Sequence, residues 1–250
     1  MPLIQTIQSG KTDKPPRLMI YGPEGIGKTK FATKTHKPVF IDIEDGVGAF
    51  DAPRFPLARS WDDVAAQLAA VRDEPHEFRT LVVDSLDFLE RLIHDRVCAD
   101  FGAKNLEKVD GGYGRGYSYA LSYWRKFVTA LEEIRDRRAM CIVLLAHSKV
   151  EKFQDPDAAA DYDRYSPRLH KLANALISDW VDAILFATRR IRVSKEDGKA
   201  TAIGAGGGQR VLRTVGGPSC VAKNRFDLPD EIDLSWTSFV ENIGKGAVRG

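Results

Sequence analysis

Two hydrophobic periodicities alternate along most of the chain. Short runs that are apolar on both faces predict buried strands. These runs lie at 17–22, 37–44, 80–85, 140–148 and 181–190. Apolar positions at helical spacing predict helices at 28–36, 61–73, 86–101, 119–138 and 166–180. In the last helix, Ser166 is a candidate N-cap and Pro167 the first helical residue. Strands alternating with helices predict an α/β fold with a mostly parallel sheet between helices.

The pattern changes after residue 190. Short strand-like stretches follow one another without helices between them, which predicts antiparallel hairpins that extend the sheet. The 250 residues are 43% hydrophobic, enough for one sizeable core, and nothing marks a second domain. We therefore expect an N-terminal arm at 1–16, a core at 17–227 and a C-terminal tail at 228–250.

Charge is sorted along the chain although the net charge is only +2. Residues 41–100 hold fourteen acidic and six basic side chains, whereas 189–225 hold nine basic and two acidic ones. Such sorting is typical either of a polyanion-binding face or of an ordinary solvated surface. Three scattered cysteines without a metal-binding spacing favour a reducing, cytoplasmic location. No apolar run approaches ~18 residues, so we expect no membrane partner.

The clearest chemical motif is "GPEGIGKT", which fits the spacing GxxxxGK[ST] between a strand and a helix. Its glycines let backbone N–H groups turn toward phosphate oxygens, and the start of the helix favours the same anion. Lys28 is placed to reach the β- and γ-phosphates, and the Thr29 hydroxyl to bind Mg²⁺. The motif predicts ATP and Mg²⁺ as cofactors. The expected nucleotide-binding residues are Gly22, Pro23, Glu24, Gly25, Ile26, Gly27, Lys28, Thr29 and Lys30.

Three strand ends supply further candidates. Asp84 ends an apolar strand and is the expected second Mg²⁺ ligand. Glu44 ends another strand, which lies next to the phosphate strand if the order is that of a P-loop ATPase; it could activate water, in competition with Asp42 and Asp45. His147 follows the fourth strand, where it could sense the γ-phosphate or be purely structural.

Together these motifs resemble the RecA-type ATPase core. "IYGPEGIGKT", "FIDIE" and "LVVDS" look like its phosphate loop, catalytic-glutamate strand and magnesium strand, which implies a catalytic Glu44 and a metal-binding Asp84. "AKNRFD" resembles the KNRFG motif of RadA, although Asp227 replaces the glycine. The resemblance implies that Lys223 and Arg225 reach the ATP of a neighbouring subunit, and that His147 takes the place of a Gln in RecA.

A bare core of this size resembles phage-encoded, RecA-like single-strand annealing recombinases. That resemblance implies single-stranded DNA binding, annealing during recombination, and head-to-tail assembly into a ring or filament in the host cytoplasm. A single-strand-binding protein is a further possible partner. Two alternatives stay open: a helicase or loader motor of the DnaB/RadA kind, and a nucleotide-gated interaction ATPase that does not act on DNA.

Two segments correspond to the DNA loops of RecA-like proteins, at about 102–117 and 148–165. Both mix cations with aromatic residues, which suits phosphate neutralisation and base stacking as well as an ordinary surface loop. The expected DNA-binding residues are Lys104, Lys108, Tyr113, Arg115, Tyr117, Lys149, Lys152, Phe153 and Arg164.

Overall fold

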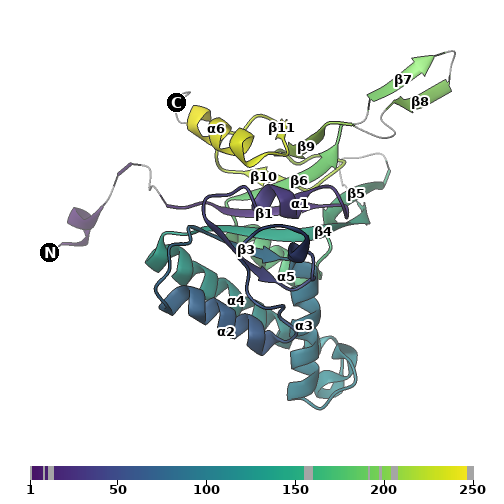
Figure 1. Cartoon of the computed structure of the whole chain (residues 1–250). Helices are drawn as coiled ribbons and strands as arrows, with labels where there is room; N and C mark the ends of the chain where they lie inside the picture. The colour runs from purple at the N-terminus through teal and green to yellow at the C-terminus, as the bar shows by residue number, and fades with distance from the viewer. Residues whose placement is uncertain are drawn as a thin grey trace.

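A central sheet and its covering helices form the body of the protein (Figure 1). The computed structural model describes residues 2–7, 9–10, 14–154, 160–190, 192–196, 199–203 and 208–246. The α-helices are α1 (Lys28–Ala32), α2 (Trp61–Asp73), α3 (Leu86–Asp100), α4 (Arg115–Arg138), α5 (Lys171–Trp180) and α6 (Trp236–Gly246). Three 3-10 helices are η1 (Leu3–Thr6), η2 (Val47–Ala49) and η3 (Leu106–Gly111). The strands are β1 (Arg17–Gly22), β2 (Pro38–Asp42), β3 (Thr80–Asp84), β4 (Cys141–Phe153), β5 (Tyr162–Pro167), β6 (Ala183–Arg189), β7 (Arg192–Glu196), β8 (Lys199–Ile203), β9 (Arg210–Arg213), β10 (Lys223–Asn224) and β11 (Glu231–Asp233).

The strand order confirms the predicted α/β class. The sheet runs β11-β9-β6-β1-β4-β3-β2, with β10 also paired to β6. Strands β6, β1, β4, β3 and β2 are parallel, and the later strands β9, β10 and β11 pair antiparallel. One expected neighbour is wrong: β2 lies at the sheet edge beside β3, so two strands, β3 and β4, separate it from the phosphate strand β1.

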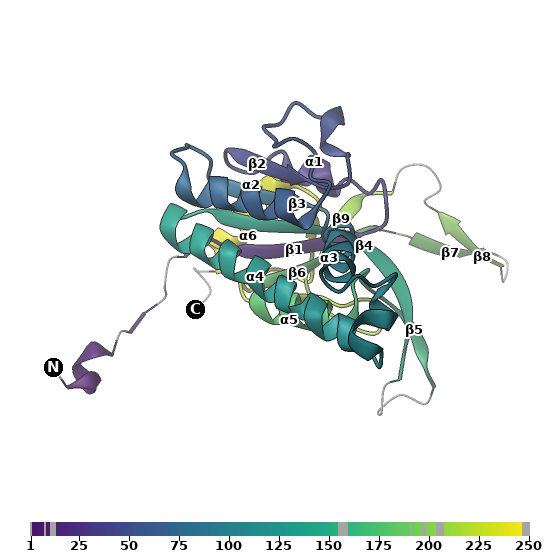
Figure 2. The same ribbon diagram turned by 90° about the horizontal axis from the view of Figure 1, so that it is seen from below.

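Two apolar layers cover the sheet. Helices α2, α3, α4 and α5 pack on one face, and α1 and α6 pack on the other (Figures 1 and 2). Alternate side chains of each strand enter opposite layers, as for Met19 and Ile20 of β1, which are both fully buried. Burial on both faces explains why the parallel strands are continuous apolar runs.

The described residues beyond 227, at 228–246, belong to this packed body rather than to a separate tail. β11 pairs with β9 inside the sheet, and Phe239 of α6 is fully buried against Trp236 and Phe226. The expected tail is therefore corrected for its described part, 228–246. Within the expected arm at 1–16, the 3-10 helix η1 stands away from the body in Figure 1 and its side chains are exposed, whereas Lys14 forms an ion pair with Asp136 of α4.

Both expected DNA loops are more regular than the sequence indicated. α4 begins at Arg115, so the end of the first segment is helical. β4 continues to Phe153 and pairs with β5 in an antiparallel hairpin, and from Lys149 onward its residues alternate between half-buried and exposed. Part of the second loop, 155–159, lies outside the described residues. The predicted helix start at Ser166 is also wrong, since Ser166 lies in β5 and His170 caps α5.

Candidate functional site: a phosphate loop with a carboxylate cluster

The strand register brings the predicted site residues together at the carboxyl-terminal end of the parallel strands. Gly22 of β1 pairs with His147 of β4, and Asp42 of β2 pairs with Asp84 of β3. These residues lie at or next to the carboxyl ends of parallel strands, which is where open α/β sheets bind ligands. Gly22 is also required sterically, because a Cβ there would lie 2.3 Å from the carbonyl oxygen of Ala187 in β6.

The loop from Gly22 to Thr29 depends on glycine for its backbone conformation. Gly25 and Gly27 adopt φ values of 70° and 110°, which favour glycine, and Gly27 is the N-cap of α1. The buried Lys28 ammonium donates to the carbonyl oxygens of Gly22 and Pro23 at 3.0 and 3.1 Å. Burial lowers the pKa of Lys28 although nearby carboxylates oppose the shift. A bound phosphate would therefore replace the Gly22 and Pro23 carbonyls as the acceptor of the Lys28 ammonium.

The two predicted metal ligands already touch. The Thr29 hydroxyl donates to Asp84 Oδ2 at 2.7 Å, and Asp84 is 3% exposed. A hydroxyl and a carboxylate beside a phosphate loop are the hard oxygen ligands that suit Mg²⁺. Burial raises the pKa of Asp84 to about 6, with Glu44 and Asp42 adding to the shift and Thr29 and Lys28 opposing it. The cluster therefore fits a divalent cation, whose positive charge would stabilise the ionised form of Asp84.

Glu44 is the carboxylate that faces this cluster. Its Oε1 lies 3.4 Å from His147 Nε2, and the Ser85 hydroxyl donates to its Oε2 at 2.9 Å. The competing carboxylate of Asp42 has another role: it is buried and accepts hydrogen bonds from the backbone of Asp45 and Val47, which shapes the turn after β2. Glu44 is thus positioned even though β2 does not neighbour β1, because its backbone N–H donates to the Asp84 carbonyl at 3.3 Å.

Two residues of this cluster have no motif in the sequence. Asp87, which is 4% exposed, accepts a hydrogen bond from the His147 backbone at 3.0 Å and lies 3.1 Å from His147 Nδ1. Arg168 donates to Asp87 at 2.7 Å and lies 3.6 Å from Glu24 of the phosphate loop. Burial alone would raise the pKa of Asp87, but the hydrogen bonds from His147 and Arg168 outweigh it and hold that pKa well below its usual range. Asp87 and Arg168 therefore fix the His147 ring against Glu44.

A cavity of about 390 Å³ joins the phosphate loop to Glu44, Asp84 and His147. Its lining residues are Glu24, Gly25, Gly27, Lys28, Thr29, Lys30, Glu44, Phe50, Asp84, His147 and Arg210. Of the other predicted nucleotide-binding residues, Ile26 is buried in the apolar layer under α1. No motif marks Arg210, which reaches the cavity from β9 far along the chain.

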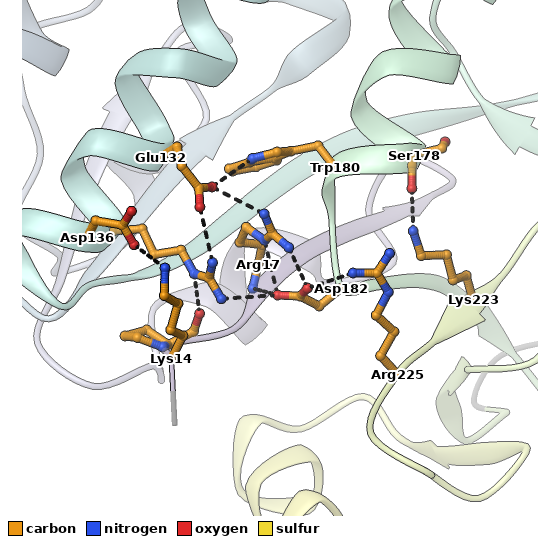
Figure 3. A network of polar contacts seen from close by, with 11 residues as sticks. Lys14, Arg17, Glu132, Asp136, Ser178, Trp180, Asp182, Lys223 and Arg225 are labelled. Carbon is orange, nitrogen blue, oxygen red and sulfur yellow. Dashed lines mark hydrogen bonds and ion pairs between the residues drawn. The ribbon is translucent and has the colours of Figure 1, made fainter. Parts of the chain in front are cut away.

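Lys223 and Arg225 lie at the end of the sheet opposite the phosphate loop. Figure 3 shows their contacts. β10 pairs antiparallel with the start of β6, so these two side chains stand near Asp182, which precedes β6. Arg225 Nη1 is 3.4 Å from Asp182 Oδ1, and Lys223 Nζ donates to the Ser178 carbonyl. The Arg225 side chain remains 56% exposed. The fold therefore does not bring this pair to the phosphate loop of its own chain.

The predicted DNA-binding residues fall into two groups. Lys104, Lys108, Tyr113 and Lys152 are exposed, and Tyr113, at φ 55°, is fully so. The others are engaged within the protein: Arg115 with Asp110, Tyr117 stacked on His170 at 4.1 Å, Lys149 with the Leu169 carbonyl, and Arg164 over the Phe153 ring at 3.7 Å. Tyr117 packs against the core, so its position favours a structural role.

The raised pKa of Asp84 predicts that Asp84→Asn stabilises the protein without nucleotide or metal. A carboxyl whose pKa is raised in the folded state binds its proton more tightly when folded, so stability falls as pH rises from about 4 through 6. The amide cannot ionise, so we expect a higher Tm than wild type at pH 8, and a difference that shrinks as the pH approaches 4. Thermal unfolding in EDTA measures it, with exposed Asp51→Asn as control. A lower Tm at pH 8 would contradict the burial argument.

Comparisons with known proteins agree with this geometry. The model of the family described as "AAA domain" matches residues 14–226. The chain is also 26% identical over 141 residues to the SPbeta prophage-derived uncharacterized protein YorG of Bacillus subtilis (strain 168). That alignment spans 54% of this chain and 42% of the relative. Among the described helices, none has both the length and the apolar character needed to cross a bilayer.

Proposed function

The chain belongs to the AAA domain family, and from this premise we propose that it is an ATP- and Mg²⁺-dependent protein that binds single-stranded DNA and promotes strand annealing in phage recombination. The prophage origin of a relative supports the phage context. One observation carries the DNA part of the proposal: strand β4 connects the nucleotide cavity directly to the segment expected to bind DNA. His147 lies in the cavity, and from Ser148 onward the same strand becomes one arm of the β4–β5 hairpin.

The position of Lys223 and Arg225 supports head-to-tail assembly. A charged pair at the far end of the sheet from its own phosphate loop can serve a nucleotide only in another subunit. Such a contact joins two different surfaces, so it is heterologous and repeats into a ring or a filament. In this arrangement the two cations stabilise charge on the neighbour's γ-phosphate, as arginine fingers do.

Lys28, Thr29, Asp84, Glu44 and His147 have distinct roles in hydrolysis under this proposal. Backbone N–H groups of the loop and the Lys28 ammonium hold phosphate oxygens, while Thr29 and Asp84 hold Mg²⁺. The metal would neutralise phosphate charge. Glu44 accepts a proton from water as general base, and its orientation is maintained by His147 and Ser85. His147 links the occupancy of this cavity to the hairpin that begins at the next residue.

The DNA part predicts that Tyr113→Ala combined with Lys152→Ala weakens single-stranded DNA binding by tenfold or more. Tyr113 offers a fully exposed ring for stacking, and Lys152 an exposed cation on the hairpin. Stacking contributes about 1–3 kcal/mol per base, and each lost phosphate contact lowers the salt slope by about 0.7. Fluorescence anisotropy of a labelled oligonucleotide at several salt concentrations, with ATP and Mg²⁺, measures both effects.

Lys34→Ala is the matched control, because Lys34 is an exposed lysine that follows α1 on the way to the start of β2, away from the cavity. Its DNA affinity and salt slope should equal those of wild type. Wild-type protein that does not bind single-stranded DNA would favour the nucleotide-gated interaction ATPase. Directional unwinding of a forked duplex would favour the helicase or loader.

A further inference from the structure

Arg210 reaches the phosphate loop from a distant part of the same chain. β9 pairs antiparallel with β6, and the register places Arg210 opposite Arg189, the last residue of β6. β6 is parallel to its neighbour β1, so Arg210 lies at the carboxyl-terminal end of both strands, where β1 leads into the phosphate loop. The Arg210 side chain lines the cavity together with Lys28 and Thr29.

The guanidinium lies directly against Gly27. A Cβ added to Gly27 would meet Arg210 Nη1 at 3.0 Å and a Leu234 methyl at 3.7 Å. The backbone N–H of Leu234 donates to the Arg210 carbonyl at 3.0 Å, which holds the two residues side by side next to Gly27. Gly27 is the N-cap of α1, so the backbone N–H groups from here into the first turn have no partner within the helix. Arg210 thus adds a full positive charge beside the backbone donors.

Arg210 also differs from the other arginines around it. Arg189 donates to the Gly208 carbonyl, Arg190 pairs with Glu231, and Arg213 donates to the Ser219 hydroxyl. Among the residues that the structure describes, the Arg210 guanidinium has no hydrogen bond, ion pair or ring contact. Its five N–H donors are therefore free to face the cavity. A group of this kind fits phosphate oxygens, which it can bind in a bidentate manner.

We propose that Arg210 binds the polyphosphate of the nucleotide held by its own subunit, from the side of Gly27. This inference rests on the nucleotide binding assumed in the proposed function and adds a contact within the subunit. Arg210 would hold ADP as well as ATP, in an isolated subunit and without DNA. Lys223 and Arg225, in contrast, would act only once a neighbour is present. Nucleotide loading and subunit assembly would then use different cations.

The test is isothermal titration of ADP and of a non-hydrolysable ATP analogue into wild type, Arg210→Ala and Arg210→Lys. We expect Arg210→Ala to weaken both affinities by about 10- to 100-fold, as for loss of a charged hydrogen bond. Arg210→Lys should recover part of the loss, because a lysine restores the charge but not the bidentate geometry. Arg213→Ala, on the same strand but paired with Ser219, is the matched control and should bind as wild type does.

The outcomes separate this inference from the proposed function. Wild-type affinity retained within about twofold in Arg210→Ala would overturn the role of Arg210 alone. Wild-type protein that binds neither nucleotide would overturn the proposed ATP dependence, and the Arg210 assignment with it. Normal nucleotide binding with the expected Arg210 effect, but no DNA binding, would refute the proposed function and leave the Arg210 contact in place.

Discussion

Mixing two inactive variants should restore ATP hydrolysis that neither shows alone. One variant, Lys223→Ala with Arg225→Ala, keeps its phosphate loop and lacks the cations offered to a neighbour. The other, Lys28→Ala, lacks the loop cation and keeps the pair. A trans contact of the arginine-finger kind is worth about 10³- to 10⁵-fold in rate, so the first variant alone should be nearly inactive. In a 1:1 random head-to-tail assembly, roughly one interface in four is intact. The rate of phosphate release by the mixture in the presence of single-stranded DNA measures how much ATP hydrolysis is restored.

The first variant should remain folded, because the buried charge it uncovers keeps other partners. Asp182 is hydrogen-bonded twice by the Arg17 guanidinium, at 2.7 and 3.1 Å, and lies 3.7 Å from Arg135. Removing Arg225 thus leaves Asp182 paired (Figure 3). ADP affinity and Tm of the variant are the controls. Hydrolysis by this variant at the wild-type rate would disprove the trans role. The absence of recovery in mixtures that demonstrably co-assemble would disprove the head-to-tail geometry.

The sequence predicted those parts of the site that are contiguous in the chain. The phosphate loop depends on eight successive residues, and Asp84 on the apolar strand before it, so local pattern was sufficient. Asp87, Arg168 and Arg210 enter the site through tertiary contacts with residues about 60 to 180 positions away in the chain. No periodicity or spacing marks such contacts in a single sequence.

The features that the sequence does not predict have the same physical origin. Strand order is decided by crossover connections, so a motif at the end of β2 did not reveal that β2 lies at the edge. The β4–β5 hairpin consists mostly of polar, alternating residues, which composition alone assigns to a loop. An aromatic ring next to glycines makes Tyr117 resemble a loop residue, yet Tyr117 lies in helix α4 and its ring stacks on His170. In each case long-range packing decides a feature that the local sequence pattern does not determine.

Glu44→Gln is expected to lower the rate of ATP hydrolysis by about 10²- to 10⁴-fold while nucleotide binding is preserved, because general-base catalysis contributes on that order. Glutamine keeps the size of the side chain and can still accept the Ser85 hydroxyl that now reaches Glu44 Oε2 at 2.9 Å. It cannot take a proton from water. Single-turnover phosphate release measures the chemical step, and ADP titration measures binding.

Glu24→Gln is the matched control for this substitution. Glu24 also lines the cavity and also carries a carboxylate, but its side chain is 75% exposed and lies 3.6 Å from Arg168 in a surface ion pair. Its loss should change hydrolysis by only a few-fold, since an exposed ion pair contributes little. Equal losses in the two variants would point to general electrostatics of the cavity. A large loss in Glu24→Gln alone would move the general base to the phosphate loop. Only a loss specific to Glu44 fits a carboxylate that His147 and Ser85 hold in position for proton transfer.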